Sequence, residues 1–513
     1  MPGLSRRALF AGSAVGVAAS VLPAPAEARP TSPPGCARYR AEYHHTVPDG
    51  WKNDPQRPVW IDGTYHCYYL YNADYVTGVV GTAWRLATST DLVAFRDAGV
   101  AVPKDTTPNG DVWSGSAVVD TDGTAGFGAG AVVVLATMSP GEGADHQAQF
   151  LYYSTDRGRT FTPYGTAPVL TNPGVADFRD PKVIRDEERG RWVMALAEGT
   201  KVGFYHSDDL KSWTYAGGFV KEGIGILECP DLFRLTADDG TAKWVLGVSG
   251  NGKGAGLPNT YAYWTGTFDG STFTADAGDP QWLDHGFDWY GAVTFDRHRA
   301  DGSVDPGVRY AMGWLNNWDY ANVTPTIDCD GFNGTDSIVR EVTLKRMGSG
   351  AYYLASRPVA ALDDHVSRTM RLGDIPVDGS LVLDYTGTAY ELTCRITWDR
   401  LTGAGVQLRR SADGSRHIDA GIYRDYAFVN RRGAVNPDVS GRWQESRSPF
   451  DPSGGTVTLR ILVDRTSVEM FVDDGRCTHS SEVFPYLVDT GLALFTIDGG
   501  AVFRDVVVRE FGV

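Results

Sequence analysis

Tyr153-Ser154-Thr155-Asp156, followed by Phe161, is one of four similar segments from which the fold of this chain can be predicted. Each segment combines an alternating apolar stretch, a polar turn that contains Asp, and a second stretch with an aromatic residue. This order is typical of a β-hairpin, and Asp suits the turn because its side chain can hydrogen-bond its own backbone. The other three copies are Ala87-Thr88-Ser89-Thr90-Asp91 with Phe95, His206-Ser207-Asp208-Asp209 with Trp213, and Trp264-Thr265-Gly266-Thr267-Phe268-Asp269 with Phe273.

The four hairpins recur at a roughly constant interval. Their Asp residues, at positions 91, 156, 209 and 269, lie 53 to 65 residues apart. A repeat of this length holds four short strands, which make up one blade of a β-propeller. Residues 36–350 are therefore predicted to form a five-bladed β-propeller. A TIM barrel is not favoured, because it needs long amphipathic helices between strands and the sequence shows almost no helical periodicity.

A second region begins after Arg357-Pro358. It contains short apolar stretches such as residues 390–398 and 457–463, and Val468-Glu469-Met470-Phe471-Val472 ends at the turn Asp473-Asp474-Gly475. Turn signals every 8–12 residues are typical of a β-sandwich. The sequence thus predicts an all-β chain in which a β-sandwich, residues 358–513, follows the propeller.

The N-terminus has the features of an export signal. Arg6-Arg7 precedes an apolar stretch from Ala11 to Leu22, and Ala26-Glu27-Ala28 forms a small-residue cleavage site. A twin arginine before a stretch too short to span a bilayer is typical of a Tat-type signal peptide. A membrane anchor is less favoured, because charged and Pro-rich sequence follows directly. We assign residues 1–28 to the signal and expect a secreted protein.

Charge and composition limit the possible partners. The 513 residues include 63 Asp and Glu against 47 Lys and Arg, a formal net charge of −16. Nucleic acid and anionic membranes would repel such a chain, so neither is expected as a partner. No H-E-x-x-H motif or phosphate-binding loop occurs, so no metal or cofactor is expected. We expect a monomer, and the pairing of the cysteines at 36, 67, 229, 329, 394 and 477 stays open.

Three acidic segments stand next to apolar strands, each with a proline one or two positions after the acid. Proline fixes the backbone and removes a donor, so each acid is expected at the start or a bend of a strand. The first strands of propeller blades line the central channel, where acids from three blades can meet. Each Asp-Pro taken alone is also compatible with a simple turn. The segments are Trp51-Lys52-Asn53-Asp54-Pro55, Phe178-Arg179-Asp180-Pro181 and Glu228-Cys229-Pro230.

In order and spacing, these segments resemble the acidic motifs of glycoside hydrolase family 32, which includes invertases, inulinases, levanases and fructosyltransferases. The resemblance covers essentially all of the chain after the signal, and it implies the same five-bladed propeller and β-sandwich. Other segments that resemble family elements are Trp113-Ser114-Gly115-Ser116, Asp288-Trp289-Tyr290, Gly313-Trp314-Leu315-Asn316-Asn317-Trp318, Arg340-Glu341 and Ser467-Val468-Glu469-Met470-Phe471.

The resemblance implies a catalytic role for each acid. Asp54 would be the nucleophile, Glu228 the general acid/base, and Asp180 the residue that stabilises the transition state through sugar hydroxyls. In a retaining glycosidase one ionised carboxylate attacks the anomeric carbon, and a second, protonated one releases the leaving oxygen. We expect Arg179 to keep Asp180 charged. Glu228 is expected among apolar neighbours.

Eight further residues are expected to contact the substrate. An amide suits sugar hydroxyls, and indole rings suit sugar faces, although core packing explains the tryptophans nearly as well. Cys229 is interpreted as a buried packing residue and not as a nucleophile. The eight residues are Trp51, Asn53, Gln56, Arg57, Trp113, Ser114, Arg179 and Trp314.

Some positions depart from the family pattern. Gln56-Arg57 stands where the family has Asn-Gly, and Leu70 stands where a Gln is common. The Asp-Pro-Gln-Arg-Pro variant resembles a smaller actinobacterial group that acts on levan, the β-2,6-linked fructan. Some members release the disaccharide levanbiose, and others, the levan fructotransferases, close the terminal disaccharide into difructose anhydride. The resemblance therefore points to a pocket for two fructosyl units.

We predict an extracellular, exo-acting levanase that releases levanbiose from levan. The alternatives are a levan fructotransferase, a β-fructofuranosidase acting on inulin or sucrose, and a fructan-binding module without catalysis. Hydrolase and fructotransferase differ in whether water or a hydroxyl of the bound outer fructose attacks the fructosyl-enzyme, which is a matter of geometry. The sequence does not separate these two outcomes.

Overall fold

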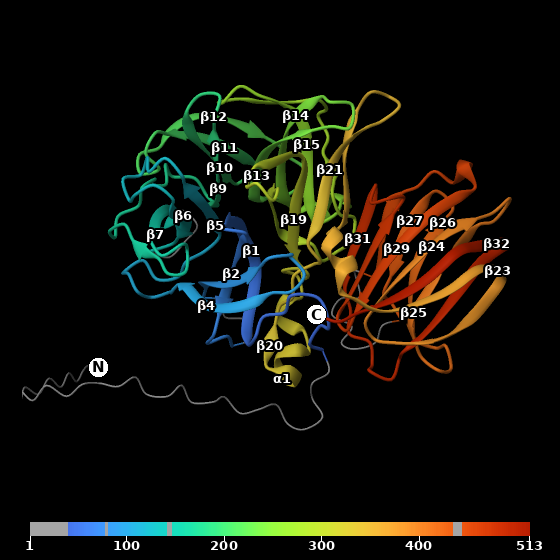
Figure 1. Cartoon of the computed structure of the whole chain (residues 1–513). Coiled ribbons are helices and arrows are strands. Elements are labelled where there is room, and N and C mark those ends of the chain that lie inside the picture. The colour runs from blue at the N-terminus through green and yellow to red at the C-terminus, as the bar shows by residue number, and fades with distance from the viewer. Residues whose placement is uncertain (1–38, 77–80, 141–145, 434–443) are drawn as a thin grey trace, which may run out of the picture.

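The computed structural model describes residues 39–76, 81–140, 146–433 and 444–513. The predicted signal, residues 1–28, lies outside the described residues. Figure 1 shows two all-β units side by side, a ring of blades coloured blue to yellow and a second unit coloured orange to red. Among the helices of the described part of the chain, none has the length and apolarity needed to cross a membrane.

The first unit is a five-bladed β-propeller, as predicted. Each blade is an antiparallel meander of consecutive strands, and the first strands of the blades contact one another around the channel. Numbered in chain order, blade I consists of β1 (Gly50–Ile61), β2 (Thr64–Asn72), β3 (Ala83–Ser89) and β4 (Arg96–Val102); blade II of β5 (Gly115–Asp120), β6 (Ala131–Met138), β7 (Ala148–Ser154) and β8 (Thr162–Pro163); blade III of β9 (Phe178–Asp186), β10 (Arg191–Glu198), β11 (Lys201–Ser207) and β12 (Thr214–Val220); blade IV of β13 (Leu227–Thr236), β14 (Ala242–Gly250), β15 (Tyr261–Phe268) and β16 (Phe273–Ala275), with β17 (Gln281–Trp282) beside β15; and blade V of β18 (Tyr290–His298), β19 (Val304–Trp314), β21 (Arg340–Arg346) and β22 (Tyr352–Pro358).

The repeated hairpins of the sequence are the outer two strands of blades I to IV. Asp91 Oδ1 accepts hydrogen bonds from the backbone N–H groups of Val93 and Ala94, both at 2.9 Å. In the same way, Asp269 Oδ1 accepts hydrogen bonds from the backbone N–H groups of Ser271 and Thr272, both at 2.8 Å. Blade V turns at Gly348-Ser349-Gly350 and has no such Asp, so the repeat reveals four of the five blades.

The ring closes between blade V and blade I. The segment between β19 and β21 contains η3 (Ala321–Val323), α1 (Thr326–Asp330) and β20 (Phe332–Asn333). β20 pairs in parallel with the start of β1, where Trp51 lies opposite Asn333. This segment therefore lies beside the residues that lead to Asp54. A second short helix, η2 (Gly252–Ala255), follows β14 of blade IV.

The second unit is the predicted β-sandwich. Its strands form one hydrogen-bonded network, because β32 pairs with β25 along its first half and with β24 along its second half. Leu392, Val406 and Ile461 lie in its buried core. The elements are η4 (Ala360–His365), β23 (Val366–Thr386), β24 (Tyr390–Thr397), β25 (Gly403–Arg410), β26 (Ile418–Tyr423), β27 (Tyr426–Asn430), β28 (Glu445–Pro449), η5 (Pro452–Gly454), β29 (Thr456–Asp464), β30 (Ser467–Val472), β31 (Cys477–Glu482) and β32 (Gly491–Phe511).

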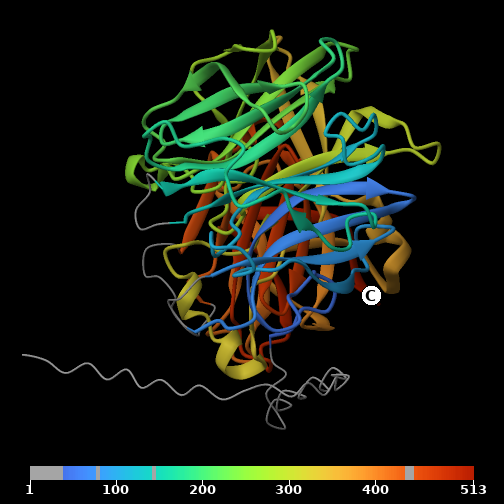
Figure 2. The ribbon, with the colours of Figure 1, turned by 90° about the vertical axis from the view of Figure 1, so that its left-hand side faces the viewer.

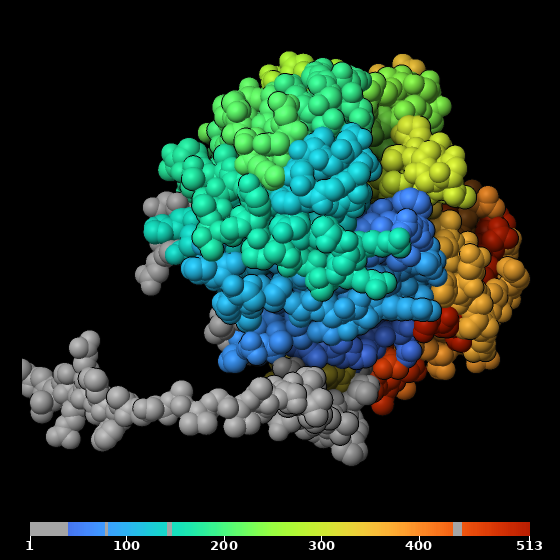
Figure 3. Space-filling model, turned by 60° about the vertical axis from the view of Figure 1, so that its left-hand side comes forward, coloured from blue at the N-terminus to red at the C-terminus, as the bar shows by residue number. Residues whose placement is uncertain are grey.

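A buried ionic cluster joins the two units. Arg340 of blade V donates to Asp284 Oδ2 at 2.8 Å and to Glu469 of β30. His44 lies 2.9 Å from Asp464 and 3.0 Å from Glu469, and these two carboxylates outweigh the effect of burial and raise its pKa to about 9. Buried charges persist only when they are paired, so the interface fixes the sandwich against the propeller. Figure 2 shows the sandwich behind the blades, and Figure 3 shows it at the right of them.

Candidate active site

The three predicted acids lie on the innermost strands of three blades, each at a β-bulge. A bulge inserts one extra residue and re-aims the neighbouring side chain. The proline that follows each acid has no N–H to give to the ladder, which explains why the pairing slips there. The slips lie between Lys52 and Pro55 in β1, between Arg179 and Lys182 in β9, and between Glu228 and Asp231 in β13.

Backbone strain marks the same positions. Asp180 has φ 63° and Cys229 has φ 46°, in the left-handed region that side chains other than Gly, Asn and Asp rarely adopt. Gly291 of β18, with φ 54°, faces Asp54 so closely that a Cβ there would lie 2.4 Å from Asp54 Oδ1. Strain of this kind is retained where it holds a functional group in place.

Asp54 lies at the bottom of the site. Its residue is 9% exposed, and Oδ2 accepts a hydrogen bond from Ser114 Oγ at 2.8 Å. Oδ1 is buried and has no hydrogen-bond partner among the described residues. Burial raises the pKa of Asp54, the Ser114 hydrogen bond opposes this, and the charge of Glu228 adds to the rise. The predicted Ser114 thus contacts the carboxylate directly.

Asp180 is buried next to the other two acids. Its Oδ2 accepts from the backbone N–H of Cys229 at 3.0 Å, and its own N–H donates to Thr137 Oγ1 at 3.0 Å. Burial raises the pKa of Asp180 to about 6, with Glu228 adding to the rise and Arg179 opposing it. Arg179, whose Nε is 3.9 Å from Asp180 Oδ2, favours the charged form of Asp180 as expected, but burial outweighs its effect on the pKa.

Glu228 is the most open of the three acids, with 22% of its side chain exposed. Arg179 donates to Glu228 Oε1 from Nε at 3.2 Å and from Nη2 at 2.9 Å, and Nη1 pairs with Asp177. Tyr290 OH donates to Glu228 Oε2. The expected apolar surroundings are thus wrong. A cation and a phenol hold both carboxylate oxygens in position.

Cys229 lies between the two buried carboxylates. Its Sγ is 3.6 Å from Asp54 Oδ2 and 3.7 Å from Asp180 Oδ2. Burial, with both carboxylates, raises the pKa of the thiol well above its usual value. A neutral S–H is a weak donor, so Cys229 bridges the acids and is neither simple packing nor a nucleophile.

Two of the residues expected to bind substrate instead connect the blades. Gln56 has no exposed surface and bonds Asp54 O at 3.1 Å, Ser114 Oγ at 3.2 Å and the N–H of Gly115 at 2.7 Å. Arg57 is also buried, and it donates to Gly115 O at 2.8 Å and to Pro230 O at 2.7 Å. Both side chains direct polar atoms at the backbone of blades I, II and IV, which favours a structural role over substrate contact.

The tryptophans and the asparagine that were predicted to contact the substrate differ in their burial. Trp51 and Trp314 are completely buried and pack on each other, so neither ring offers a face to a sugar. Asn53 is nearly buried and accepts a hydrogen bond from Trp51 Nε1 at 2.8 Å. Trp113 keeps a partly exposed side chain beside Ser114.

The rim of the candidate active site contains two aromatic residues, Trp318 and Tyr75, that were not among the residues predicted to contact the substrate. Trp318 is 40% exposed and lies nearly parallel to Trp51, with ring centroids 6.0 Å apart. Tyr75 stacks on Trp51 at 4.8 Å and donates to Asn322 Oδ1 at 2.7 Å. The family-like segment that ends at Trp318 was noticed in the sequence, but its pattern does not show which tryptophan is exposed.

Loops from three blades meet at this rim. The Tyr75–Asn322 hydrogen bond joins the loop after β2 to the segment after β19. An ion pair between Lys253 and Asp319 joins the same segment to the Gly-rich loop of blade IV, residues 250–256. The segment that carries Trp318 is therefore held from both sides.

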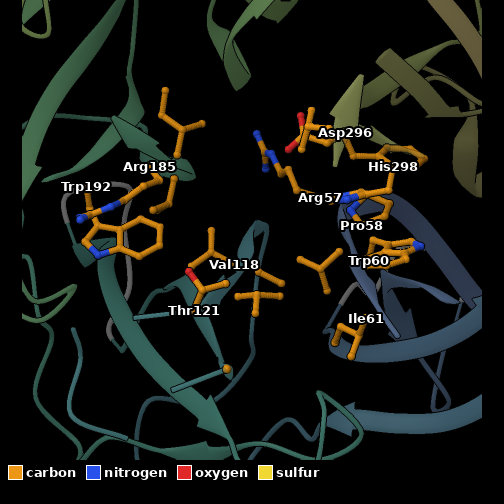
Figure 4. Close-up of a pocket in the computed structure, with 18 of the residues that line it drawn as sticks. Arg57, Pro58, Trp60, Ile61, Val118, Thr121, Arg185, Trp192, Asp296 and His298 are labelled. Carbon is orange, nitrogen blue, oxygen red and sulfur yellow. The ribbon is translucent and has the colours of Figure 1, made fainter. Parts of the chain in front are cut away.

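A separate cavity of about 990 Å³ occupies the other end of the channel. It is lined by the same inner strands beyond the bulges, and Figure 4 shows Arg57 reaching into it, with Trp60 and Trp192 on opposite walls. None of the three acids lines it. The candidate active site is therefore the end of the channel that holds the acids, and Arg57 separates it from this cavity.

Within the described residues, the cysteines and possible metal ligands add no second site. Cys67, Cys229, Cys394 and Cys477 are free thiols, and Cys36 lies outside the described residues. Across the parts of the chain that are described, no group of three or more His, Cys, Asp or Glu side chains is arranged to hold a metal ion.

The raised pKa of Asp180 predicts a pH-dependent cost to stability. Well below pH 3.8 the carboxyl is protonated in both states. Between its ordinary pKa of 3.8 and about 6 the folded state holds the extra proton, so stability falls as pH rises. Asp180→Asn is therefore expected to gain of the order of 2 kcal/mol over the wild type at pH 7 and little at pH 4. Calorimetric Tm values at both pH values check this.

Asp231 provides a control of opposite sign. Burial raises its pKa, but Lys182 and Arg309 outweigh burial and hold the pKa below its usual value. Asp231→Asn should therefore lower Tm at pH 7. If Asp180→Asn also lowered Tm at pH 7, the ionised Asp180 would not be a destabilising group.

Known proteins resemble this chain over nearly its whole described length. The family model described as "Glycosyl hydrolases family 32 N-terminal domain" matches residues 44–358, and the one described as "Glycosyl hydrolases family 32 C terminal" matches residues 362–510. The two matches together span the propeller and the sandwich.

Among similar proteins, the levanbiose-producing levanase of Bacillus subtilis (strain 168) is 52% identical over 476 residues, which cover 92% of this chain and 91% of that protein. The levanbiose-producing levanase of Geobacillus stearothermophilus is 52% identical over 401 residues, 78% of this chain and 100% of that protein. Among solved structures, the exo-inulinase of Aspergillus awamori superimposes with a TM-score of 0.81 at 27% identity, covering 93% of this chain and 98% of that one.

Proposed function

Because the chain belongs to glycosyl hydrolase family 32, we propose that it is a retaining levanase that cleaves β-2,6-fructosidic bonds in levan and releases levanbiose from the chain end. The observation that carries the chemistry is the convergence of Asp54, Asp180 and Glu228 at three bulges of one channel. The two levanbiose-producing relatives, each 52% identical, support the substrate and the product.

In the proposed first step, an oxygen of Asp54 attacks C2 of the bound fructosyl unit. The bond from C2 to the leaving oxygen breaks, and Glu228 gives its proton to that oxygen. In the second step, Glu228 takes a proton from water, the resulting hydroxide displaces Asp54 from C2, and configuration is retained. The burial of the two side chains supports these roles, since the nucleophile Asp54 is at the bottom of the site and the proton donor Glu228 is more exposed.

Asp180 and Ser114 have supporting roles in this proposal. Asp180 would accept hydrogen bonds from fructosyl hydroxyls, which strengthen as the ring becomes an oxocarbenium-like cation. Ser114 holds the Asp54 carboxylate in place through its hydrogen bond to Oδ2. Asn53, Trp113 and Arg179 remain candidates for substrate contact at the mouth.

The rim gives a physical reason for a disaccharide product. Trp318 presents an exposed ring next to the buried Trp51, and its segment is fixed by Tyr75–Asn322 and Lys253–Asp319. A fixed aromatic face beside the first fructosyl site suits a second fructosyl ring, because sugars stack on indole. We therefore propose that the outer fructosyl unit of levan lies on Trp318.

A product assay on levan tests the proposed function. Purified protein is expected to release levanbiose from the first minutes, and to act on levan faster than on inulin or sucrose. A non-reducing cyclic dimer as the main product would identify a fructotransferase. Longer oligomers early in the reaction would indicate internal cleavage, and free fructose from sucrose at a higher rate would indicate a plain β-fructofuranosidase.

Removing the Trp318 ring is expected to change the product. Trp318→Ala should lower kcat/KM on levan about tenfold, as expected for one lost stacking contact, and should raise the ratio of fructose to levanbiose. Chromatography of the products measures both. Tyr215→Ala removes another exposed aromatic residue, at the outer edge of blade III, and should change neither quantity. An unchanged product ratio in Trp318→Ala would contradict the role of this ring.

We extend the proposal to the remaining sequence predictions. Residues 1–28 are proposed to direct Tat-type export, so that the enzyme meets its polymeric substrate outside the cell. Residues 36–350 and 358–513 are proposed as the two domains, and the enzyme is proposed to act as a monomer. Exchange of Arg6-Arg7 for two lysines should retain the precursor inside the cell, which immunoblotting of cell and medium fractions measures.

A further inference from the structure

We propose that Arg431, a residue of the β-sandwich, is a positioning residue for Glu228 in the propeller. The inference rests on the proposed function, because it assigns Glu228 to the proton-transfer steps. It gives the C-terminal domain a part in catalysis, through a chain of contacts that crosses the domain interface and ends on a catalytic oxygen.

The first link is the guanidinium of Arg431, which follows β27 and is almost fully buried. Its Nη1 donates to Asp288 Oδ2 at 2.6 Å and to Glu482 O at 2.8 Å, and its Nη2 donates to Tyr320 OH at 2.8 Å. Asp288 is completely buried and also accepts the N–H of Glu482 at 2.7 Å. The planar fork thus fixes one propeller carboxylate against the backbone of β31.

The second link runs along the chain from Asp288 to Tyr290. Between them, Trp289 is fully buried and donates from Nε1 to Ser337 Oγ at 2.9 Å. Tyr290 begins β18, and its hydroxyl donates to Glu228 Oε2. Tyr290 is only two residues from Asp288 along the chain, so a shift of Asp288 is expected to move the Tyr290 hydroxyl relative to Glu228.

The third link attaches the rim to the same arginine. Tyr320 OH bonds Asp288 Oδ1 as well as Arg431, and Asn317 Nδ2 donates to Phe287 O at 3.0 Å. The segment that carries Trp318 is therefore fastened to the residues just before Asp288. One sandwich side chain thus orders both the partner of the proposed acid/base and the proposed second sugar site.

A general acid contributes only when it is held within hydrogen-bond reach of the leaving oxygen, and small displacements of such groups reduce kcat strongly. Arg431→Lys keeps the positive charge beside Asp288 but cannot bond Asp288, Glu482 and Tyr320 with one planar group. The expected result is therefore a catalytic defect in a folded protein.

A double-mutant cycle with Tyr290→Phe tests the connection. Arg431→Lys in the wild-type background is expected to lower kcat on levan about tenfold. In the Tyr290→Phe background, where the contact with Glu228 is already lost, the same change is expected to cost less than twofold. Equal losses in both backgrounds would overturn the proposal, because Arg431 would then act independently of Tyr290.

Arg409→Lys is the matched control. Arg409 is equally buried, but its guanidinium donates to backbone carbonyls within the sandwich, at Asp489, Thr388 and Tyr486. It should lower Tm and leave kcat unchanged in both backgrounds. If Arg431→Lys does not fold, Asp288→Asn takes its place in the same cycle, with the same two outcomes.

The wild-type enzyme separates this inference from the proposed function. If it hydrolyses inulin or sucrose in place of levan, the proposed substrate is wrong, and the cycle is measured on the fructan that is cleaved. If it hydrolyses none of the three, the proposed function and this inference are both overturned.

Discussion

Asp54→Asn is expected to lower kcat on levan by about 10⁴-fold or more, because the variant has no carboxylate to attack C2. The amide has the same size and shape as the carboxyl group, and its oxygen can still accept the hydrogen bond that Ser114 Oγ gives to Asp54 Oδ2 at 2.8 Å. Folding should therefore be kept. Initial rates of levanbiose release, together with Tm, measure the two effects separately.

Asp120→Asn is the control for this substitution. Asp120 is a completely buried Asp at the end of the innermost strand of blade II, where it accepts the N–H groups of Thr124 and Ala125 at 2.9 and 2.8 Å. Its exchange is expected to reduce Tm without reducing kcat. A fructan-binding module would behave differently, since Asp54→Asn would then leave its whole function, binding to levan, intact.

The fold was largely predictable because the outer hairpins of four blades repeat a turn in which an Asp side chain accepts hydrogen bonds from nearby backbone N–H groups. Asp91, Asp209 and Asp269 each accept from the N–H groups two and three residues ahead, and Asp156 accepts from those three and four residues ahead. Such a local pattern survives in the sequence. Blade V lacks this Asp turn, so the total of five blades was predicted from the length of the region alone. In the sandwich, β26 and β27 went unpredicted, because these strands are short and depend on their neighbours for pairing.

The positions of the acids were predictable for a related reason. A proline next to an acid is a local signal that the ladder is interrupted, and all three interruptions are bulges on inner strands. The partners of the acids were not predictable in this way. Arg179 is adjacent to Asp180 in sequence, yet its guanidinium bonds Glu228 of the next blade, a contact that only the ring of blades creates.

Burial explains why closeness in sequence to Asp54 was a poor guide to the contacts of polar and aromatic residues. Gln56 and Arg57 are polar and stand beside the nucleophile, so sequence proximity suggested substrate contact. The structure directs both side chains into the contacts between blades, where they satisfy backbone groups that a channel wall would otherwise leave unpaired. For the tryptophans, the pattern gives no sign that Trp51 and Trp314 are buried while Trp318 is exposed.

Glu228→Gln is expected to reduce kcat on levan by about 10²- to 10⁴-fold, the usual contribution of a general acid/base. The amide keeps an oxygen for Arg179 Nη2, now 2.9 Å from Glu228 Oε1, but it carries no proton for the leaving oxygen. Loss of the base also slows the second step. On p-nitrophenyl β-fructofuranoside, whose leaving group needs little protonation, the variant should therefore show a burst of nitrophenol and accumulate the fructosyl-enzyme.

The covalent intermediate makes this prediction specific. Mass spectrometry of the intact variant should show the added mass of one fructosyl residue, mapped to the peptide of Asp54. Azide, which attacks without a general base, should restore turnover and give a fructosyl azide of retained configuration. Glu198→Gln, which changes a buried glutamate that accepts a hydrogen bond from Tyr205 OH at 2.7 Å, should show neither effect. An inverted azide product would show that the two carboxylates act by direct displacement, without an intermediate on Asp54.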